Sequence, residues 1–596
     1  MAEAPKRPCK QCGELIKLRG IGSHEKACAK KQMAQAQSMA FAQQLQVQVL
    51  ENGDGREENL PLPSLPNPEP EQRSELPSGP KLDDIQYIYH PHSKRSSETC
   101  TLREHLQQES ARRRIPSTNE TPWAPFHTRL DFEVAEFAQE NMLNRAATNK
   151  LITLIRRCAE NMKDLTIVHS ADIDKQWDAA AKKCTDFKKY DVVVPYKNNT
   201  GTTTEKFDMY ARPLWDWAVD LIKDPSLSRC FVWDSVRMFR HNGVSFIRFW
   251  NEPWTADALW EIQSKLPDNP DAKPCPFILY ADKSKLSSFG TQKAYPIIAR
   301  LANVVVGIRN SDDWGGGQVV GELPVVQDDT AVSGKTRYVN FKNAVWHASF
   351  YKLLESVARH SKTGIWTLCG DGKERWLFPV ILILAADYEE AHHPCPVCLI
   401  HRDEQSDLTI IADLRTAQGS KEAVETAQSS SAEAGENLLK GLGLRKVENA
   451  FWNVANSDAH HATSFERLHS NHSGLGGDHL IGQVKAHLEN LEGRAAAKVD
   501  KHFNSFPRWR NLNHFQSVTN ISFNDGSKHE DIAKMMVYAS HDVLTDKAGF
   551  LLLQCLRSYL EVDLYVGLEL HTAETIAAGR RHLQKFDRLM KEYGND

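Results

Sequence analysis

Two apolar runs in this sequence each end in an aspartate. The first lies at the start of the stretch Pro276 to Gly290: it begins at Pro276 and ends in Asp282, and turn residues follow up to Gly290. The second, Trp376 to Ala386, is followed directly by Asp387. Short apolar runs that are rich in β-branched and aromatic residues and bounded by turn residues predict buried strands. Each strand would present one carboxylate at its carboxyl end. The alternative is that both aspartates simply terminate strands, because aspartate is common in turns.

The segments between the two aspartates predict how the strands are arranged. Residues 294–308 and 318–326 are strand-like, and residues 343–360 carry apolar side chains at helical spacing. Strand, strand, strand, helix, strand is the order of a ribonuclease H-like core, in which the first and fourth strands lie side by side. Paired carboxylates there suit Mg²⁺, and two such ions could clamp both oxygens of an in-line phosphoryl displacement. We therefore expect an α/β fold with a mixed sheet of this type, and magnesium held by Asp282 and Asp387.

Length and composition restrict the class of protein. A chain of 596 residues predicts two to four domains, and a net charge of -4 gives no global case for a nucleic-acid partner. No run approaches the roughly 18 apolar residues of a membrane span, and the first residues form no apolar signal region, so we expect no membrane association. Twelve cysteines without such a signal favour thiols and metal ligands over disulfides.

The N-terminus carries the pattern C-x2-C-x11-H-x3-C. Its members are Cys9, Cys12, His24 and Cys28. His24 and Cys28 lie one helical turn apart, so four nitrogen and sulfur ligands could close a tetrahedron around zinc. Four protein ligands leave no open position, which predicts a structural C2HC zinc finger over residues 1–31.

The same stretch is locally basic. The first 31 residues hold eight Lys or Arg and three Glu, a surplus of 8 - 3 = +5. Such a surplus could neutralise phosphates of double-stranded DNA. A finger that binds protein, or that simply folds, is the alternative. The residues expected to contact DNA are Lys6, Arg7, Lys10, Lys17 and Arg19.

Composition shifts divide the rest of the chain. Residues 32–50 favour a helix that could pair with another copy as a coiled coil in a homo-oligomer, and 51–120 are Pro, Glu and Ser rich, typical of a disordered linker. Within the next region, a strand is expected at 187–196 and a helix at 214–222. The remaining expected domains are a mostly helical region at 121–270, the catalytic core at 271–402, a helical insertion at 403–545, and helices completing the core at 546–596.

Five short motifs resemble one family of proteins. They are Pro-Phe-His-Thr-Arg-Leu-Asp-Phe-Glu at 125–133, Leu-Tyr-Ala-Asp-Lys at 279–283, Ala-Asp-Tyr-Glu-Glu at 386–390, Cys-Pro-Val-Cys at 395–398 and Phe-Pro-Arg-Trp-Arg at 506–510. Over residues 121–593 the chain is similar to the Plavaka-type transposases of fungal mobile elements, related to the CACTA and Kyakuja-Dileera-Zisupton groups. The resemblance implies a nuclear, ribonuclease H-like nuclease with a DDE-type acidic triad that acts on the ends of its own element.

Further site residues follow the second aspartate. Cys395 and Cys398 form half of a zinc site, with His392, His393 and His401 close by in sequence; a solvated turn is the alternative. The family's DxxH motif is matched by Glu466 and His469, with Glu in place of Asp, and Asp458, His460 and His472 stand at matching positions. This histidine-rich segment could also be ordinary polar helix surface.

A third acid is expected from the last helices. The candidates are Glu561, Asp563, Glu569 and Glu574, and Glu561 is favoured because it follows the apolar helical run 549–560. The sequence thus predicts a magnesium-dependent DNA transposase. The alternative is a catalytically inactive, transposase-derived zinc-finger protein that binds DNA or protein, which the Glu at position 466 favours slightly.

Overall fold

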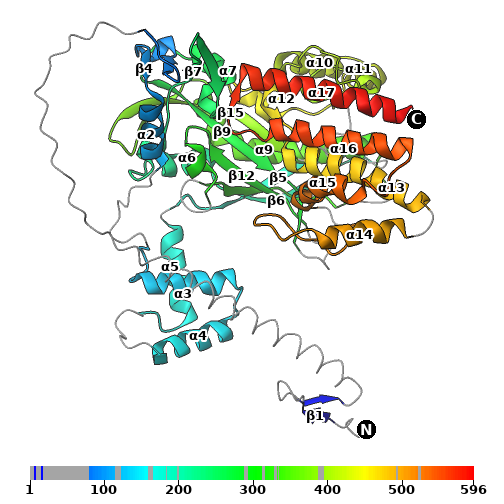
Figure 1. Ribbon diagram of the computed structural model, residues 1–596. Coiled ribbons are helices and arrows are strands. Elements are labelled where there is room, and N and C mark those ends of the chain that lie inside the picture. Colours follow the sequence, from blue (N-terminus) through cyan, green and yellow to red (C-terminus); the bar gives the residue numbers. More distant parts are fainter. Residues whose placement is uncertain are drawn as a thin grey trace, which may run out of the picture. The chain divides into compact units, whose positions relative to one another are not determined.

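The computed structural model describes most of the chain, and the chain divides into two compact units, Met1–Ser78 and Gly79–Asp596 (Figure 1). In the first unit, strands β1 (Lys6–Pro8) and β2 (Leu15–Lys17) form an antiparallel pair. The four predicted finger ligands and the predicted helix 32–50 lie outside the described residues, so both stay predictions. The described residues are 6–8, 15–17, 79–113, 123–158, 166–182, 184–197, 201–286, 293–311, 316–327, 332, 334–386, 395–491, 494–520 and 525–595.

An eight-stranded mixed sheet forms the centre of the second unit. Along the sheet the order is β14, β15, β9, β12, β13, β6, β5, and β16 pairs with the carboxyl end of β15. The strands are β5 (Lys188–Lys197), β6 (Thr202–Ala211), β9 (Ala272–Ala281), β12 (Pro296–Leu301), β13 (Gln318–Glu322), β14 (Ile365–Leu368), β15 (Glu374–Ala386) and β16 (Thr463–Ser464). The predicted strands around Asp282, at 187–196 and before Asp387 are confirmed.

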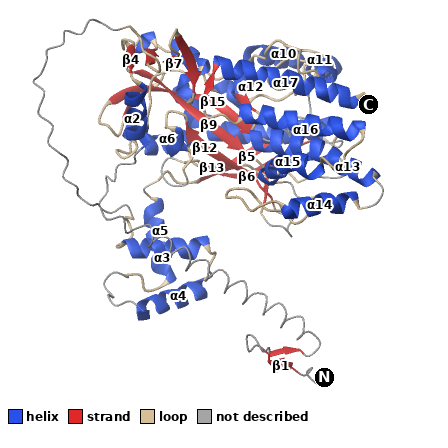
Figure 2. Cartoon of the chain, in the orientation of Figure 1, coloured by secondary structure: helices blue, strands red, loops and turns tan. Residues whose placement is uncertain are grey.

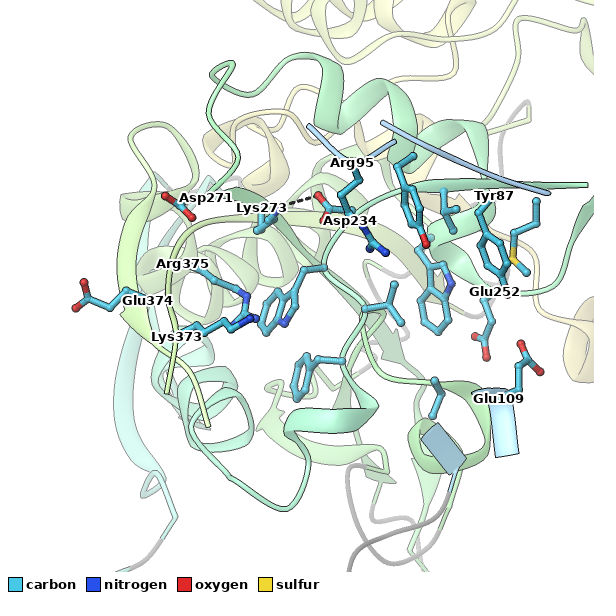
Figure 3. A pocket seen from close by; sticks show the side chains of 18 residues that line it. Tyr87, Arg95, Glu109, Asp234, Glu252, Asp271, Lys273, Lys373, Glu374 and Arg375 are labelled. Atoms are coloured by element: carbon cyan, nitrogen blue, oxygen red, sulfur yellow. Dashed lines mark hydrogen bonds and ion pairs between the residues drawn. The ribbon is translucent and has the colours of Figure 1, made fainter. Parts of the chain in front are cut away.

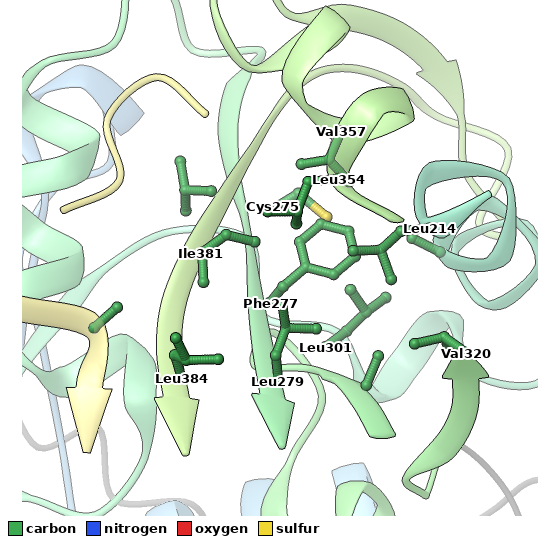
Figure 4. Packing of buried hydrophobic residues seen from close by; sticks show 14 of the residues in the cluster. Leu214, Cys275, Phe277, Leu279, Leu301, Val320, Leu354, Val357, Ile381 and Leu384 are labelled. Atoms are coloured by element: carbon green, nitrogen blue, oxygen red, sulfur yellow. The ribbon is translucent and has the colours of Figure 1, made fainter. Parts of the chain in front are cut away.

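Three neighbouring strands of this sheet run parallel. β9 pairs with β15 so that Ala281 stands opposite Ala386, and β15 pairs with β16 so that Ala385 stands opposite Ser464. β12 is antiparallel to both β9 and β13. The carboxyl ends of β9, β15 and β16 therefore meet at one edge of the sheet, and Figure 4 shows the three arrows pointing the same way.

The long helix α9 (Thr336–Ser361) covers one face of the sheet, as the helical spacing at 343–360 predicted. Alternate residues of β9 point at it: Cys275, Phe277 and Leu279 are fully buried because side chains two apart share a face of a strand. Leu354 and Val357 of α9 close over them (Figure 4). Helix α6 (Leu214–Ile222), which has the predicted bounds, adds Leu214 to the same core. This packing fixes the position at which β9 ends.

A second sheet begins within the range that was expected to be linker. It has the order β17, β8, β7, β3, β4. Its strand β3 buries Ile85 and Tyr87 against the main core, so order starts well before Thr121. Its strands are β3 (Ile85–Tyr89), β4 (Glu98–Cys100), β7 (Val236–His241), β8 (Phe246–Trp250) and β17 (His571–Thr572). Because β7 and β8 lie within residues 121–270, that region holds strands as well as helices.

Helices α3 (Arg129–Glu140), α4 (Arg145–Cys158) and α5 (Ser170–Ala181) have a small core of their own. The motif at 125–133 builds it. Phe126 is buried there, and Thr128 caps α3 by accepting a hydrogen bond from the backbone of Asp131. The buried Asp131 carboxylate accepts hydrogen bonds from Thr166 N at 3.1 Å and Thr166 Oγ1 at 2.6 Å. These residues of the motif therefore have structural roles.

The C-terminal third is mostly helical, as predicted, and Figure 2 separates these helices from the strands. No helix among the described residues is long and apolar enough to cross a membrane. The helices are α10 (Ala417–Ser429), α11 (Ala432–Gly441), α12 (Ala459–Ala462), the π-helix η7 (Arg467–Ile481), α13 (Gly482–Asn490), α14 (Ala495–Ser505), α15 (Gly526–Ser540), α16 (Lys547–Val566) and α17 (Ala573–Gly594). β16 lies inside the expected insertion and joins it to the main sheet.

Candidate acidic site at the carboxyl ends of the parallel strands

Asp282 stands at the carboxyl end of β9, the first of the three parallel strands. Its side chain is 17% exposed, and Tyr280 donates a hydrogen bond from its hydroxyl to Asp282 Oδ2 at 3.2 Å. On the neighbouring strand the last residue is Ala386, level with Ala281. The next residue in the chain, Asp387, lies outside the described residues, so its approach to Asp282 stays a prediction.

The third parallel strand delivers Glu466. β16 ends at Ser464, and Glu466 caps the following π-helix by accepting hydrogen bonds from Leu468 N at 2.9 Å and His469 N at 2.6 Å. His469 Nδ1 is also hydrogen-bonded to the Glu466 carboxylate. The other ring nitrogen, Nε2, lies 3.7 Å from Asp282 Oδ2. The structure thus brings Asp282, Glu466 and His469 together.

The π-helix η7 that carries His469 packs closely on the C-terminal helices. A Cβ atom at Gly476 would lie 2.7 Å from Tyr559 Oη, so a larger residue there would force the buried Tyr559 side chain to shift. The wider turn of a π-helix is commonly found at functional sites. Here it places His469 towards Asp282 and His472 towards α15 and α16.

A second cluster lies one turn further along η7. His472 Nε2 is 3.5 Å from Glu530 Oε2 and 3.8 Å from Asp563 Oδ1. One ligand atom of each of these residues lies within 4.8 Å of the others, and among the described residues this is the one group of three or more that could hold a metal ion. Asp563 was among the candidate acids. Glu530 was missed, because nothing in the pattern of α15 distinguishes it.

The charges of this second cluster are largely balanced by protein groups. Arg467 donates to Asp563 through Nε at 3.0 Å and Nη2 at 2.8 Å, and Asn471 donates to Asp563 at 2.6 Å. Burial lowers the pKa of His472 while the nearby carboxylates Asp563 and Glu530 act to raise it. Burial and the same two acids raise the pKa of Tyr559. The cluster therefore ties η7, α15 and α16 together whether or not an ion is bound.

Glu561 lies apart from this group. Its carboxylate accepts from Arg557 Nε at 3.1 Å and is paired with His582 at 3.0 Å and Lys585 at 3.3 Å. Although burial acts to raise it, hydrogen bonds from Arg557 and Lys585 hold the pKa of Glu561 below its usual value. Glu561 therefore joins α16 to α17, and the described contacts do not connect it with Asp282 or Glu466. Glu569 and Glu574 are exposed.

Cys395 and Cys398 form a turn that several polar contacts hold in place. Val397 N donates to Cys395 Sγ at 3.4 Å, and Arg415 Nε donates to the carbonyls of Cys395 at 2.7 Å and Cys398 at 2.9 Å. Burial raises the pKa of the Cys398 thiol. The side chain of His401 is 71% exposed, and His392 and His393 lie outside the described residues. A zinc site at the two cysteines stays a prediction.

Two other residues at matching motif positions support this turn. His460 Nδ1 is hydrogen-bonded to the carbonyl of Pro396 at 2.7 Å. Asp458 caps α12 and accepts from Ala417 N at 2.7 Å. Although burial acts to raise it, backbone N–H groups of Ala417, His461 and His460 lower the pKa of Asp458. Both residues therefore position the segment between β15 and β16.

A cavity of about 390 Å³ lies at the other end of the parallel strands (Figure 3). Aromatic side chains and charges of both signs line it. Lys273 pairs with Asp234 at 2.6 Å, and Arg375 pairs with Asp371 at 2.6 Å. Because the residues Asp271, Lys273, Glu374 and Arg375 come from the starts of β9 and β15, this cavity is remote from Asp282.

The fold and the site together define a class: a mixed α/β protein that gathers acidic and histidine side chains where parallel strands end. A family model, Plavaka transposase, matches residues 169–484, which is 316 of 596 residues and includes every strand of the main sheet. The chain belongs to the Plavaka transposase family. Membership indicates a transposase and confirms the resemblance over the matched residues. A search of curated proteins found no match.

Proposed function

We propose that this protein is a divalent-metal-dependent DNA transposase that cuts and joins strands through a DDE-type site on a ribonuclease H-like core. Family membership supports transposition. The topology supports the core: three antiparallel strands β9, β12 and β13, then helix α9, then β15 and β16 parallel to β9. The observation that carries the site is the convergence of Asp282, Glu466 and His469 at the ends of those parallel strands.

We assign Asp282, Asp387 and Glu466 as the three acids. Each follows one of three adjacent parallel strands within two residues. Glu561 is instead held between α16 and α17 by contacts with Arg557, His582 and Lys585. We therefore assign to Glu466 the role of third acid that was predicted for Glu561, and the Glu in place of the motif's Asp keeps a carboxylate at this position.

The donor set fits a hard divalent cation. Carboxylate oxygens are the ligands that Mg²⁺ prefers, and Asp282 and Glu466, joined by Asp387 as proposed, would offer enough oxygens for two ions. Bound there, such ions would supply Lewis-acid stabilisation of the attacking and leaving oxygens of a phosphodiester. The chain itself contributes fixed positions: β9 holds Asp282, the N-terminus of η7 holds Glu466, and His469 bridges the two carboxylates.

The remaining parts of the proposal concern DNA and location. The basic N-terminal stretch would bind double-stranded DNA beside a structural zinc finger at Cys9, Cys12, His24 and Cys28, and Cys395 with Cys398 would hold a second zinc ion. Action on the ends of a genomic element places the protein in the nucleus. Assembly as a homo-oligomer through residues 32–50 stays a prediction.

An inactive, transposase-derived DNA-binding protein is the second candidate. The observation that favours it is His469, which stands between Asp282 and Glu466. Incubation of the chain with labelled DNA that carries the ends of its own element distinguishes the two. An active enzyme cleaves with Mg²⁺, and cleavage stops with a chelator or in Asp387→Asn. Binding without cleavage by the wild-type chain at any Mg²⁺ or Mn²⁺ concentration supports the inactive derivative.

A further inference from the structure

Trp509 is an exposed tryptophan between two exposed arginines, Arg508 and Arg510. Trp509 is 55% exposed. Neither arginine forms an ion pair with any residue that the structure describes. An exposed aromatic face between two exposed positive charges suits an anionic partner that can stack on it.

The loop that carries these residues is firmly anchored at both ends. It follows α14, where Phe503 is fully buried, and Phe506 packs against the same core. After the tip, Asn511 adopts a positive φ of 60°, which turns the chain back, and Phe515 is buried. The arginines and the tryptophan are therefore presented by a structured turn.

Polar contacts fix the loop against two helices. Asp531 of α15 accepts hydrogen bonds from Asn513 N at 3.0 Å and Asn513 Nδ2 at 2.8 Å. Asp500 of α14 accepts from Ser517 Oγ at 2.6 Å and Val518 N at 2.8 Å. A rigid support lowers the entropic cost of binding a partner through the tip.

The same helix connects this loop with the candidate acidic site. Asp531 is the neighbour in sequence of Glu530, and Glu530 faces His472 across 3.5 Å. His472 in turn lies on η7, three residues after His469, which approaches Asp282. The Arg508–Arg510 tip and the acidic edge are thus presented by one connected group of helices.

We propose that this tip binds DNA: Arg508 and Arg510 each contact a backbone phosphate, and the Trp509 indole stacks on an unpaired base. Guanidinium groups suit phosphate oxygens, and an aromatic face suits any base. The inference rests on the proposed function for the identity of the partner. It concerns binding, so it can fail or hold independently of cleavage.

Binding should be measured by fluorescence anisotropy in the full chain carrying Asp282→Asn, without divalent metal, so that no cleavage occurs. The probes are one fully paired duplex and the same duplex with an unpaired stretch. Trp509→Ala should weaken binding of the second probe about tenfold and that of the paired duplex much less. Trp509→Phe, which keeps an aromatic face, should retain most of the affinity.

The arginines are tested by salt dependence. Arg508→Gln with Arg510→Gln should reduce the slope of log affinity against log salt by roughly 1.8 on duplex DNA, about 0.9 for each lost phosphate contact. The matched control for charge is Arg129→Gln with Arg145→Gln, also exposed arginines.

Trp366→Ala is the matched control for exposure, because Trp366 is 52% exposed and has no arginine beside it in sequence. Both controls should leave DNA binding unchanged, and thermal melting should show that every variant is folded. Wild-type affinity in Trp509→Ala and in the double arginine variant would overturn the proposal, as would equal losses in the controls. If the wild-type chain does not cleave DNA but the Trp509 and arginine variants still lose affinity as predicted, only the proposed catalysis is refuted.

Discussion

His469 Nε2 lies 3.7 Å from Asp282 Oδ2, while Nδ1 of the same ring is hydrogen-bonded to the Glu466 carboxylate. One imidazole therefore links two acids that the chain delivers on separate parallel strands. Because buried packing holds β9 and the Glu466 carboxylate caps the N-terminus of η7, the three side chains share a defined place at the edge of the sheet.

Loss of the Asp131 carboxylate should destabilise the helices α3 to α5. Asp131→Ala leaves the backbone N–H and the hydroxyl of Thr166 without their buried acceptor, which costs about 1–3 kcal/mol. Hydrogen exchange should show faster opening of residues 166–182 in the variant. Asp174→Asn, at an exposed ion pair with Arg145, is the control and should behave like the wild type. Equal protection in all three proteins would contradict the structural role of this motif.

Breaking the buried pair of Asp563 and Arg467 should lower the stability of the C-terminal helices. The side chain of Asp563 is 8% exposed. Removal of one member of a fully buried pair costs about 3–5 kcal/mol. We expect a smaller cost here, because Arg467 is partly exposed. Thermal melting of Asp563→Asn should show a clear decrease in Tm. Glu569→Gln, at an exposed acid three residues beyond the end of α16, should melt like the wild type; equal Tm values for both variants would refute the prediction.

Asp525 should make stability depend on pH. It caps α15, and hydrogen bonds from Ser527 and Lys528 lower its pKa to about 2, below the value of about 3.9 in unfolded chains. Its contribution is therefore complete above about pH 4 and is lost as the pH falls towards 2. The difference in unfolding free energy between wild type and Asp525→Ala should be about 1 kcal/mol at pH 6 and shrink below pH 4. A difference that stays constant with pH would contradict this.

Metal analysis should count the zinc sites. If both predicted sites exist, the purified full chain carries two zinc ions, with one lost in Cys12→Ser and the other in Cys395→Ser. Cys184→Ser, at an exposed cysteine outside both motifs, should lose none. Two zinc ions retained in either site variant would refute that site.

Local patterns predicted much of the fold. The apolar runs before Asp282 and Asp387 and the helical spacing in α6 and α9 are short-range signals, and the structure has these elements. β16 could not be found in this way, because it spans two residues and is a strand only by pairing with β15. For that reason Glu561, which follows a long apolar helical run, was favoured as the third acid. The strands at 85–100 were not predicted, because the linker expected from composition was drawn as far as residue 120.

The central claim is that Asp282 and Glu466 belong to one metal-dependent site and that Glu561 does not. Cleavage of a labelled element end with Mg²⁺ tests it in the wild type and in Asp282→Asn, Glu466→Gln and Glu561→Gln, with DNA binding measured in each. The account predicts that cleavage falls at least a hundredfold in the first two variants, that all variants bind DNA, and that Glu561→Gln cleaves close to the wild-type rate. Wild-type cleavage by Glu466→Gln, or loss of cleavage in Glu561→Gln with the fold intact, would contradict it.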